Sequence, residues 1–391
     1  RYNTKKMKKI LLINTKYKIF AGEDSNIEEE INFLKNKYEV SYLEFNNADN
    51  LNVFDFFSFI FATNLKSNKI IINKIKSFKP DIIYIHNTWF KVGTGAFKKI
   101  DNLNIPIILK LHNFRYDCSK SFSANKHVSK GNICPKCGFS NRKFRFFNKY
   151  YDDSVLKSIL LIIYGKKYIK VLRGLKIKIF VLTNFHKKFL EKNGIDSKKI
   201  EISYNPSDIV SSDNFYDSNS DYVVYAGRLT NSKGITELLE AWEKTNTNFI
   251  LKIIGTGELY PQLKNKYKNN SKIEIYGQLS NSDVLEEIKD SRAVITCTKM
   301  FEGQPRILCE ASSLKVPSIF PSFGGMDEFF PANYPFSFEQ FNYENLQEKI
   351  ILLEDQDLLK ETSTSVFHHI SKLLNKDTML YNFQLNVREL L

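Results

Sequence analysis

Ala293-Val294-Ile295-Thr296-Cys297, followed by Phe301-Glu302-Gly303-Gln304-Pro305-Arg306-Ile307-Leu308-Cys309-Glu310-Ala311, is the stretch that decides the fold. The short apolar run predicts a buried strand. Ile307, Ala311 and Leu314 share one face of a helix, and the Gly and Pro before it predict a connecting loop. A strand, a loop and a helix in this order are typical of a parallel α/β sheet.

The same stretch places two carboxylates around the start of the predicted helix. Glu302 lies in the loop, and Glu310 lies one turn into the helix. Unpaired N–H groups at a helix start can hold hydroxyls or phosphates, and the two carboxylates can accept hydrogen bonds from a sugar. Two ordinary surface glutamates are the alternative, and the pair alone does not decide between these interpretations.

Short β-branched runs alternate with longer helical patterns along the chain, which predicts an α/β fold with parallel sheets. The predicted strands are 9–14, 38–45, 81–87, 106–112, 178–183, 200–205, 222–227, 249–255, 273–277, 293–297 and 317–320.

The length of 391 residues exceeds what one core usually serves, so we expect two domains. The N-terminal domain is expected over 1–205 and the C-terminal domain over 221–374, with a linker rich in turn formers at 206–220. Residues 375–391 predict a helix that packs back on the N-terminal domain. Its apolar face consists of Leu380, Phe383, Val387 and Leu391.

The composition is that of a basic globular protein. Hydrophobic residues make up 42% and charged residues 26%, and 57 Lys and Arg against 43 Asp and Glu give a net charge of +14. Because most of the excess basic residues are lysines, a diffuse attraction to anionic partners is favoured over sequence-specific recognition of nucleic-acid bases. A genome bias toward Lys and Asn is the alternative explanation of this excess. Five Cys and no secretory signal pattern predict a cytoplasmic, soluble or peripheral protein.

A candidate phosphate site follows the predicted strand 222–227. Arg228 and Lys233 lie in the loop between this strand and a helix that begins near Ile235. The planar fork of an Arg and the point charge of a Lys can clamp a diphosphate at a helix start. Two ordinary surface cations are the alternative interpretation.

The first half carries two further candidates at predicted strand ends. Gly22 opens a helix after the first strand, and Ser25 and Glu28 have the spacing of a capping box. His112 closes the strand 106–112, at the sheet edge where open α/β sheets bind ligands. A structural role is the alternative for a single histidine of this kind.

Taken together and in order, these segments resemble family 4 of the glycosyltransferases. The matching motifs are Gly22-Glu23-Asp24, His112-Asn113-Phe114-Arg115, Ala226-Gly227-Arg228-Leu229 with Lys233-Gly234, and Glu302-Gly303 to Glu310-Ala311. The resemblance implies a retaining enzyme of the GT-B fold, which has two Rossmann-like parallel-sheet domains facing a central cleft. It also implies a UDP-, GDP- or ADP-sugar donor, held mainly by the C-terminal domain, and no divalent metal.

The resemblance also implies roles for individual residues. The catalytic candidates are Glu302, His112, Arg228 and Lys233, with the two cations on the diphosphate and Glu302 near the sugar hydroxyls. The donor-binding candidates are Gly22, Arg228, Lys233, Gly277, Gln278, Leu279, Glu302, Gly303, Gln304, Pro305, Arg306 and Glu310, and Gly324, Gly325 and Glu328 resemble the loop that ends the donor site. Glu310 corresponds to the ribose carboxylate, and Gly277-Gln278-Leu279 to the segment that contacts the base. The family often has an aromatic residue where Gln304-Pro305 stands, which leaves the donor sugar open.

Three cysteines cluster in the first half. Cys118, Cys134 and Cys137, with His127 between them, could form a structural zinc site. Reduced thiols in a loop are the alternative.

Residues 141–178 mix lysines and arginines with aromatic residues. This pattern suits a surface that lies on anionic lipid, and it also suits stacking on nucleic-acid bases or partial burial of the aromatic rings. Because the resemblance implies a lipid-linked saccharide acceptor, we expect contact with the inner face of the cytoplasmic membrane and no nucleic acid.

The sequence therefore predicts a glycosyltransferase that builds a bacterial capsule, O-antigen or exopolysaccharide. A nucleotide-sugar epimerase of the same fold is the first alternative. A basic nucleic-acid-binding protein is the second, and it would need clustered arginines or a binding motif.

Overall fold

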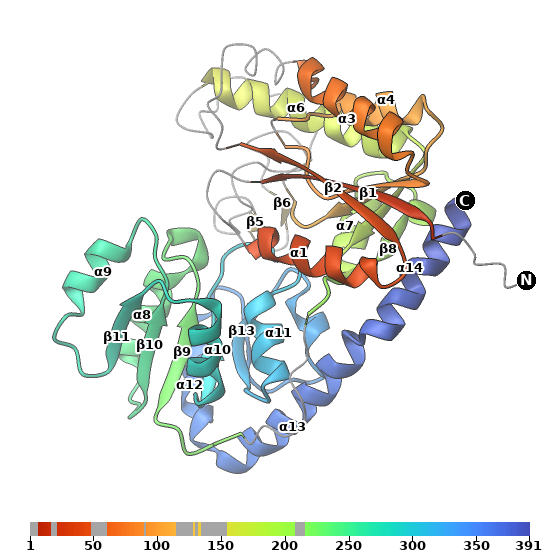
Figure 1. The fold of residues 1–391 in the computed structure, drawn as a ribbon. Helices are drawn as coiled ribbons and strands as arrows, with labels where there is room; N and C mark the ends of the chain where they lie inside the picture. The colour runs from red at the N-terminus through yellow and green to blue at the C-terminus, as the bar shows by residue number, and fades with distance from the viewer. Residues whose placement is uncertain are drawn as a thin grey trace, which may run out of the picture. The chain divides into compact units, whose positions relative to one another are not determined.

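A computed structural model describes residues 7–16, 22–47, 61–89, 91–114, 128–129, 132–133, 155–207 and 216–391. The chain forms two compact units (Figure 1). The first comprises Arg1–Phe122, Lys126–Pro206 and Lys376–Leu391, and the second comprises Ser123–Asn125 and Ser207–Asn375. Each unit is built on a six-stranded sheet.

The first unit has a parallel sheet in the order β2-β1-β3-β4-β7-β8. Its strands are β1 (Lys9–Lys16), β2 (Glu39–Asn46), β3 (Ile82–Ile85), β4 (Ile107–Leu111), β7 (Ile177–Val181) and β8 (Ile200–Ile202), and a separate antiparallel pair is β5 (Val128–Ser129) with β6 (Asn132–Ile133). Its helices are α1 (Gly22–Lys35), α3 (Leu65–Phe78), α4 (Gly95–Asp101), α6 (Val155–Gly174), α7 (Asn184–Lys192) and α14 (Lys376–Leu390).

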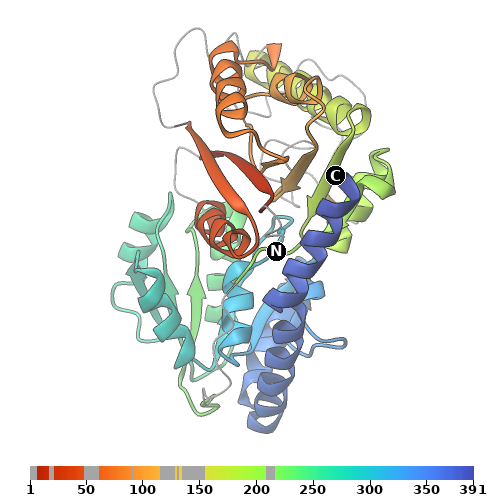
Figure 2. The same ribbon diagram turned by 45° about the vertical axis from the view of Figure 1, so that its right-hand side comes forward.

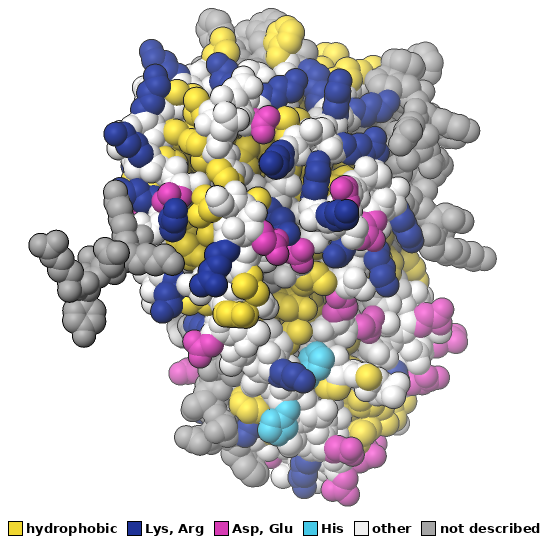
Figure 3. All heavy atoms as spheres, turned by 90° about the vertical axis from the view of Figure 1, so that its right-hand side faces the viewer, with side chains coloured by type: hydrophobic (Ala, Val, Ile, Leu, Met, Phe, Trp, Pro, Cys, Tyr) yellow, Lys and Arg dark blue, Asp and Glu magenta, His cyan; other side chains and the backbone are white. Residues whose placement is uncertain are grey.

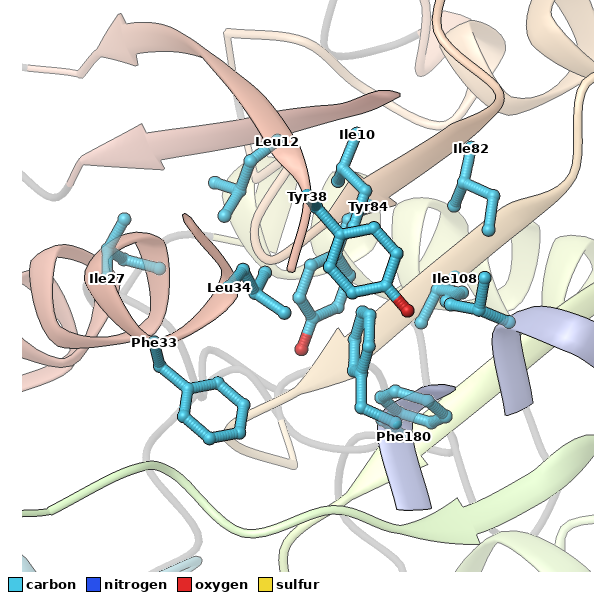
Figure 4. Close-up of a cluster of buried hydrophobic side chains, with 12 residues drawn as sticks. Ile10, Leu12, Ile27, Phe33, Leu34, Tyr38, Ile82, Tyr84, Ile108 and Phe180 are labelled. Carbon is cyan, nitrogen blue, oxygen red and sulfur yellow. The ribbon is translucent and has the colours of Figure 1, made fainter. Parts of the chain in front are cut away.

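Apolar side chains at every second position of the strands form the core on the face of this sheet that α1 covers. The strand residues Ile10, Leu12, Ile82, Tyr84, Ile108 and Phe180 meet Ile27, Phe33 and Leu34 of α1 (Figure 4). Because side chains two residues apart share a face, the polar residues near the strand ends continue the same rows toward the sheet edge.

The C-terminal helix α14 belongs to the first unit, although the second unit precedes it in the sequence. Its Phe383 ring packs against Tyr38, Tyr84 and Phe180 at centroid distances of 5.7, 5.6 and 5.9 Å. Figures 1 and 2 both show the C-terminal end of α14 beside the elements of this unit. Leu391, expected on the buried face of this helix, is instead 54% exposed because it follows the last helical residue.

The second unit has a parallel sheet in the order β11-β10-β9-β12-β13-β14. Its strands are β9 (Tyr222–Ala226), β10 (Ile250–Ile254), β11 (Ile273–Gly277), β12 (Ala293–Ile295), β13 (Ser318–Ser322) and β14 (Ser337–Glu339). Its helices are α8 (Ile235–Lys244), α9 (Tyr260–Lys266), α10 (Asn281–Lys289), α11 (Arg306–Ser313), α12 (Tyr343–Ile351) and α13 (Gln356–Leu373).

Each strand expected from the sequence overlaps a strand of the structure, and the α/β fold with parallel sheets is confirmed. The edge strand β14 and the pair β5 and β6 were not expected, because runs of two or three residues carry too little periodicity. The capping box at Ser25 is wrong, since α1 begins at Gly22 and places Ser25 inside the helix. Since all strands of a sheet run the same way, their carboxyl ends meet at one edge.

Candidate functional site

The loops after β9 and β12 meet at the carboxyl edge of the second sheet. After β9 the chain passes Arg228, makes a 3₁₀ turn over Asn231–Lys233 and enters α8 through Gly234, which has a φ of 68°. A Cβ at Gly234 would lie 1.8 Å from the carbonyl oxygen of Cys297 in the other loop. Only a glycine permits this backbone conformation together with so close an approach.

An ion pair joins the two loops. The Nζ of Lys233 lies 2.6 Å from Oε1 of Glu302, and the hydroxyl of Thr298 donates to the same oxygen at 3.0 Å. The side chains of Lys233 and Glu302 are 23% and 22% exposed, so solvent reaches both. The structure therefore brings together the predicted diphosphate cation and the predicted sugar carboxylate.

The second carboxylate lies in the helix that follows. α11 begins at Arg306 after the N-cap Pro305, and Nε of Arg306 donates to Oε1 of Glu310 at 2.8 Å. Burial raises the pKa of Glu310, and the guanidinium of Arg306 opposes this shift. Glu302 thus precedes the positive end of the α11 dipole, whereas Glu310 is buried one turn behind it.

A second ion pair fixes the loop after β12 to α8. The Nζ of Lys299 lies 2.6 Å from Oε1 of Glu237 in α8, and the backbone N–H of Lys299 donates to the carbonyl of Ser232. Burial raises the pKa of Cys297 in this loop to about 12 and also raises the pKa of Cys309 in α11. Both thiols therefore stay protonated near neutral pH, which does not suit a nucleophile.

The remaining predictions in the second unit fall at the same edge. The side chain of Arg228 is exposed, while its carbonyl accepts a hydrogen bond from the hydroxyl of Tyr225. Gly277 ends β11, with Gln278 exposed and Leu279 half-buried after it. Gly324, Gly325 and Glu328 follow β13, and Gly324 lies against the ring of Phe301.

In the first unit, His112 lies at the carboxyl edge with a partner that the sequence did not suggest. Its Nε2 lies 2.8 Å from Nδ1 of His86, which follows β3. A signal was present, because both predicted strands 81–87 and 106–112 contain a histidine near their ends. Gly22, the other candidate of this unit, is the first residue of α1.

The cysteines Cys118, Cys134 and Cys137 lie outside the described residues, so the zinc site stays a prediction that a metal assay would test. Within the described ranges no three His, Cys, Asp or Glu side chains gather as metal ligands would. Among the helices that the structure describes, none has the length and hydropathy needed to cross a bilayer.

Comparison with known proteins agrees with this geometry. Residues 208–365 match the family model "Glycosyl transferases group 1". The amylovoran biosynthesis glycosyltransferase AmsD of Erwinia amylovora is 30% identical over 152 residues, which are 37% of this chain and 43% of that protein. The chain therefore matches less than half the length of this relative.

Two solved structures share the fold over nearly the whole of both chains. The Anabaena protein HepE, in complex with UDP and glucose, has a TM-score of 0.68 and 12% identity, and the match covers 98% of this chain and 100% of that one. Sucrose-phosphate synthase from Thermosynechococcus elongatus has a TM-score of 0.71 and 11% identity, with 98% and 99% covered.

Proposed function

From the premise that residues 208–365 form a group 1 glycosyltransferase domain, we propose that this protein transfers a sugar from a nucleotide-sugar donor. The acceptor is a saccharide or a lipid-linked saccharide of a bacterial surface polysaccharide, and the anomeric configuration of the sugar is retained. The name of AmsD, which refers to the biosynthesis of amylovoran, supports the acceptor class. The donor is a UDP-, GDP- or ADP-sugar, and the UDP and glucose in the HepE crystal support a nucleotide sugar.

The observation that carries the proposal is the Lys233–Glu302 pair, which joins the loop before α8 to the loop before α11. The pair is partly buried, with side chains 23% and 22% exposed, so a ligand that separates it has to supply a new partner for each of the two charges. A diphosphate then takes Lys233, and the released Glu302 accepts hydrogen bonds from the sugar hydroxyls. The binding of one donor molecule thus gives both side chains a new partner.

The charge that develops during transfer accounts for the surrounding residues. As the bond to the anomeric carbon breaks, the diphosphate gains negative charge, which Arg228, Lys233 and the α11 dipole stabilise without a divalent metal. The acceptor hydroxyl attacks from the face that the diphosphate leaves and gives its proton to the departing diphosphate oxygen, so the configuration is retained. Glu302 contributes through charge and hydrogen bonding in this scheme and forms no covalent bond.

The other candidates hold the rest of the donor. Glu310 accepts hydrogen bonds from the ribose hydroxyls, and main-chain groups of Gly277, Gln278 and Leu279 contact the base. The loop from Gly303 through Gln304 and Pro305 to Arg306 lines the sugar and phosphate. On the first unit, His112 contacts the donor sugar and Gly22 borders the diphosphate.

We also propose that the first unit binds to the anionic lipids at the inner face of the cytoplasmic membrane. Figure 1 shows α3 and α6 on the same side of the first sheet, and neither helix contains an Asp or Glu. The cations whose side chains the structure describes are Lys66, Lys69, Lys74, Lys76, Lys166, Lys167, Lys170 and Arg173. Phe61 and Leu65 are 68% and 72% exposed beside them.

Figure 3 shows Lys and Arg side chains gathered over the first unit on the face that it draws, with hydrophobic side chains between them. The basic residues Arg142, Lys143 and Arg145, also expected on this surface, lie outside the described residues. Reversing these three charges should lower binding to anionic vesicles. Binding that stays unchanged would contradict the membrane proposal.

Mass spectrometry of the purified chain with UDP-, GDP- and ADP-sugars tests the transfer itself. Incubation with a lipid-linked or soluble saccharide should consume one donor, release its nucleoside diphosphate and add one sugar to the acceptor. The Lys233→Gln variant should lose this reaction, while Lys252→Gln, which breaks an ion pair with Glu287 in the same unit, should keep it. A donor that is epimerised without transfer would contradict the proposal.

A further inference from the structure

Polar residues continue the core rows of the first sheet toward its carboxyl edge. Lys110 and His112 lie two and four residues beyond Ile108, and His86 lies two residues beyond Tyr84. Tyr84 and Ile108 belong to the core cluster that α1 covers. The period of two therefore puts both histidines on that face, at the end of adjacent parallel strands.

The two histidines form a tight pair. Their rings stack with centroids 5.1 Å apart at 21°, and Nδ1 of His86 lies 2.8 Å from Nε2 of His112. Each ring has a second nitrogen, Nε2 of His86 and Nδ1 of His112. Both of these nitrogens are buried and have no hydrogen-bond partner among the described residues. A buried polar atom without a partner is costly, so these atoms are candidates for contact with a ligand.

A buried cation lies next to the pair. Nζ of Lys110 lies 2.7 Å from Oε2 of Glu30 and donates to the carbonyl of Tyr204, while the hydroxyl of Tyr84 donates to Oε1 of Glu30. Burial lowers the pKa of His86 and of His112 well below the usual range, and the charge of Lys110 adds to this shift. Both imidazoles are therefore neutral near pH 7.

A neutral imidazole carries one N–H, and a single hydrogen bond between two of them uses one proton. If His86 donates to His112, then Nδ1 of His112 carries the other proton and is a donor. If His112 donates to His86, then Nδ1 of His112 is an acceptor. The tautomer of His86 thus determines whether Nδ1 of His112 is a hydrogen-bond donor or an acceptor.

We propose that His86 is a positioning residue, which fixes the ring plane and the tautomer of His112 for hydrogen bonding to the donor sugar. The identity of that ligand rests on the function proposed above, whereas the pairing of the two rings does not. Without His86, the imidazole of His112 would sample both tautomers and more than one ring orientation, and fewer molecules would be competent to bind the sugar in the transition state.

Two substitutions separate positioning from simple packing. His86→Leu removes the hydrogen bond, whereas His86→Asn keeps a group that can donate or accept near the place of Nδ1. We expect kcat/KM to fall about 10- to 100-fold in His86→Leu, mainly through kcat, and to recover in part in His86→Asn. In a His112→Ala background, His86→Leu should cost no further activity. His368→Leu, at an exposed histidine of the second unit, is the matched control.

Nitrogen-15 NMR of histidine-labelled protein tests the pairing without substrate. His112 should show one tautomer in the wild type and in His86→Asn, and averaged nitrogen shifts in His86→Leu. A His112 spectrum unchanged by His86→Leu, or an equal loss of activity in both His112 backgrounds, would overturn the inference. Should no donor be turned over, the proposed function fails, and the NMR comparison still decides whether His86 sets the tautomer.

Discussion

Lys233 and Glu302 are 69 residues apart in the sequence, and their side chains lie 2.6 Å apart at the carboxyl edge of the second sheet. Each of these residues was expected to bind a different part of the donor. Their pairing means that substitution of either one also changes the state of the other, which gives predictions of opposite sign.

Lys233→Gln and Glu302→Gln should have opposite effects on the binding of the nucleoside diphosphate. Loss of the Lys233 charge should weaken binding by about 1.5–3 kcal/mol, since a hydrogen bond to a charged group is lost. Loss of the Glu302 charge should leave the affinity unchanged or up to about fivefold higher, because the carboxylate no longer competes for Lys233. Isothermal titration calorimetry measures both.

The same Glu302→Gln variant should nevertheless lose turnover, because the amide accepts hydrogen bonds from the sugar more weakly than the carboxylate does. Weaker binding of the diphosphate in Glu302→Gln would mean that Glu302 holds Lys233 in place for the phosphate, and this would contradict the exchange of partners.

Glu310 should make the binding of the nucleotide depend on pH. Burial raises its pKa above that of an ordinary carboxyl, and Arg306 opposes the shift. Because the ribose contact needs the ionised form, affinity should be retained above this raised pKa and lost as the pH falls through it. Titrations from about pH 8 to about pH 4, which reach below the ordinary pKa of a carboxyl group, should show a steeper loss in the wild type than in Glu310→Gln. Identical profiles would exclude Glu310 as the ribose carboxylate.

Much of the fold could be predicted because strands and helices are local patterns. The apolar run of β12 and the stripe of α11 are periodic, and the glycines and prolines mark their ends. Parallel strands then place Arg228 and Glu302 at one edge whatever the details of packing. The resemblance to GT-B enzymes is confirmed at the level of the fold.

The pairing of side chains could not be predicted, because it depends on tertiary contacts. The sequence presents Lys233 and Glu302 as separate motifs, and His86 and His112 are 26 residues apart on different strands. The bond between Arg306 and Glu310 differs from these, because the two residues have the i, i+4 spacing that a helix brings together, and this spacing is visible in the sequence. The roles of these residues in catalysis stay predictions.

Gly234→Ala should destabilise the second unit by at least about 2 kcal/mol. The added Cβ would meet the carbonyl oxygen of Cys297, and the φ of 68° disfavours any other residue. Gly174→Ala is the control, since a Cβ there has no neighbour within 4 Å, and it should change stability by less than about 1 kcal/mol. Chemical unfolding followed by circular dichroism compares them, and equal effects would contradict the close contact of the two loops.

Phe383→Ala should destabilise the first unit by about 3–5 kcal/mol, because it leaves a cavity between α14 and the rings of Tyr84 and Phe180. Tyr381→Ala, at a residue of the same helix that is 58% exposed, should cost less than about 0.5 kcal/mol. Hydrogen exchange of the first sheet reports the difference. If both variants exchange alike, α14 does not stabilise this unit.

The most direct test of the account is the thermal unfolding of the wild type and of Lys233→Gln with UDP, GDP and ADP. A nucleoside diphosphate at about 100 times its Kd stabilises the folded protein by about 2.7 kcal/mol, which is a measurable rise in the unfolding midpoint. We predict that at least one of the three raises the midpoint of the wild type, and that the rise is reduced in Lys233→Gln. No rise with any of them, or an equal rise in both proteins, would contradict a nucleotide-sugar site at the Lys233–Glu302 pair.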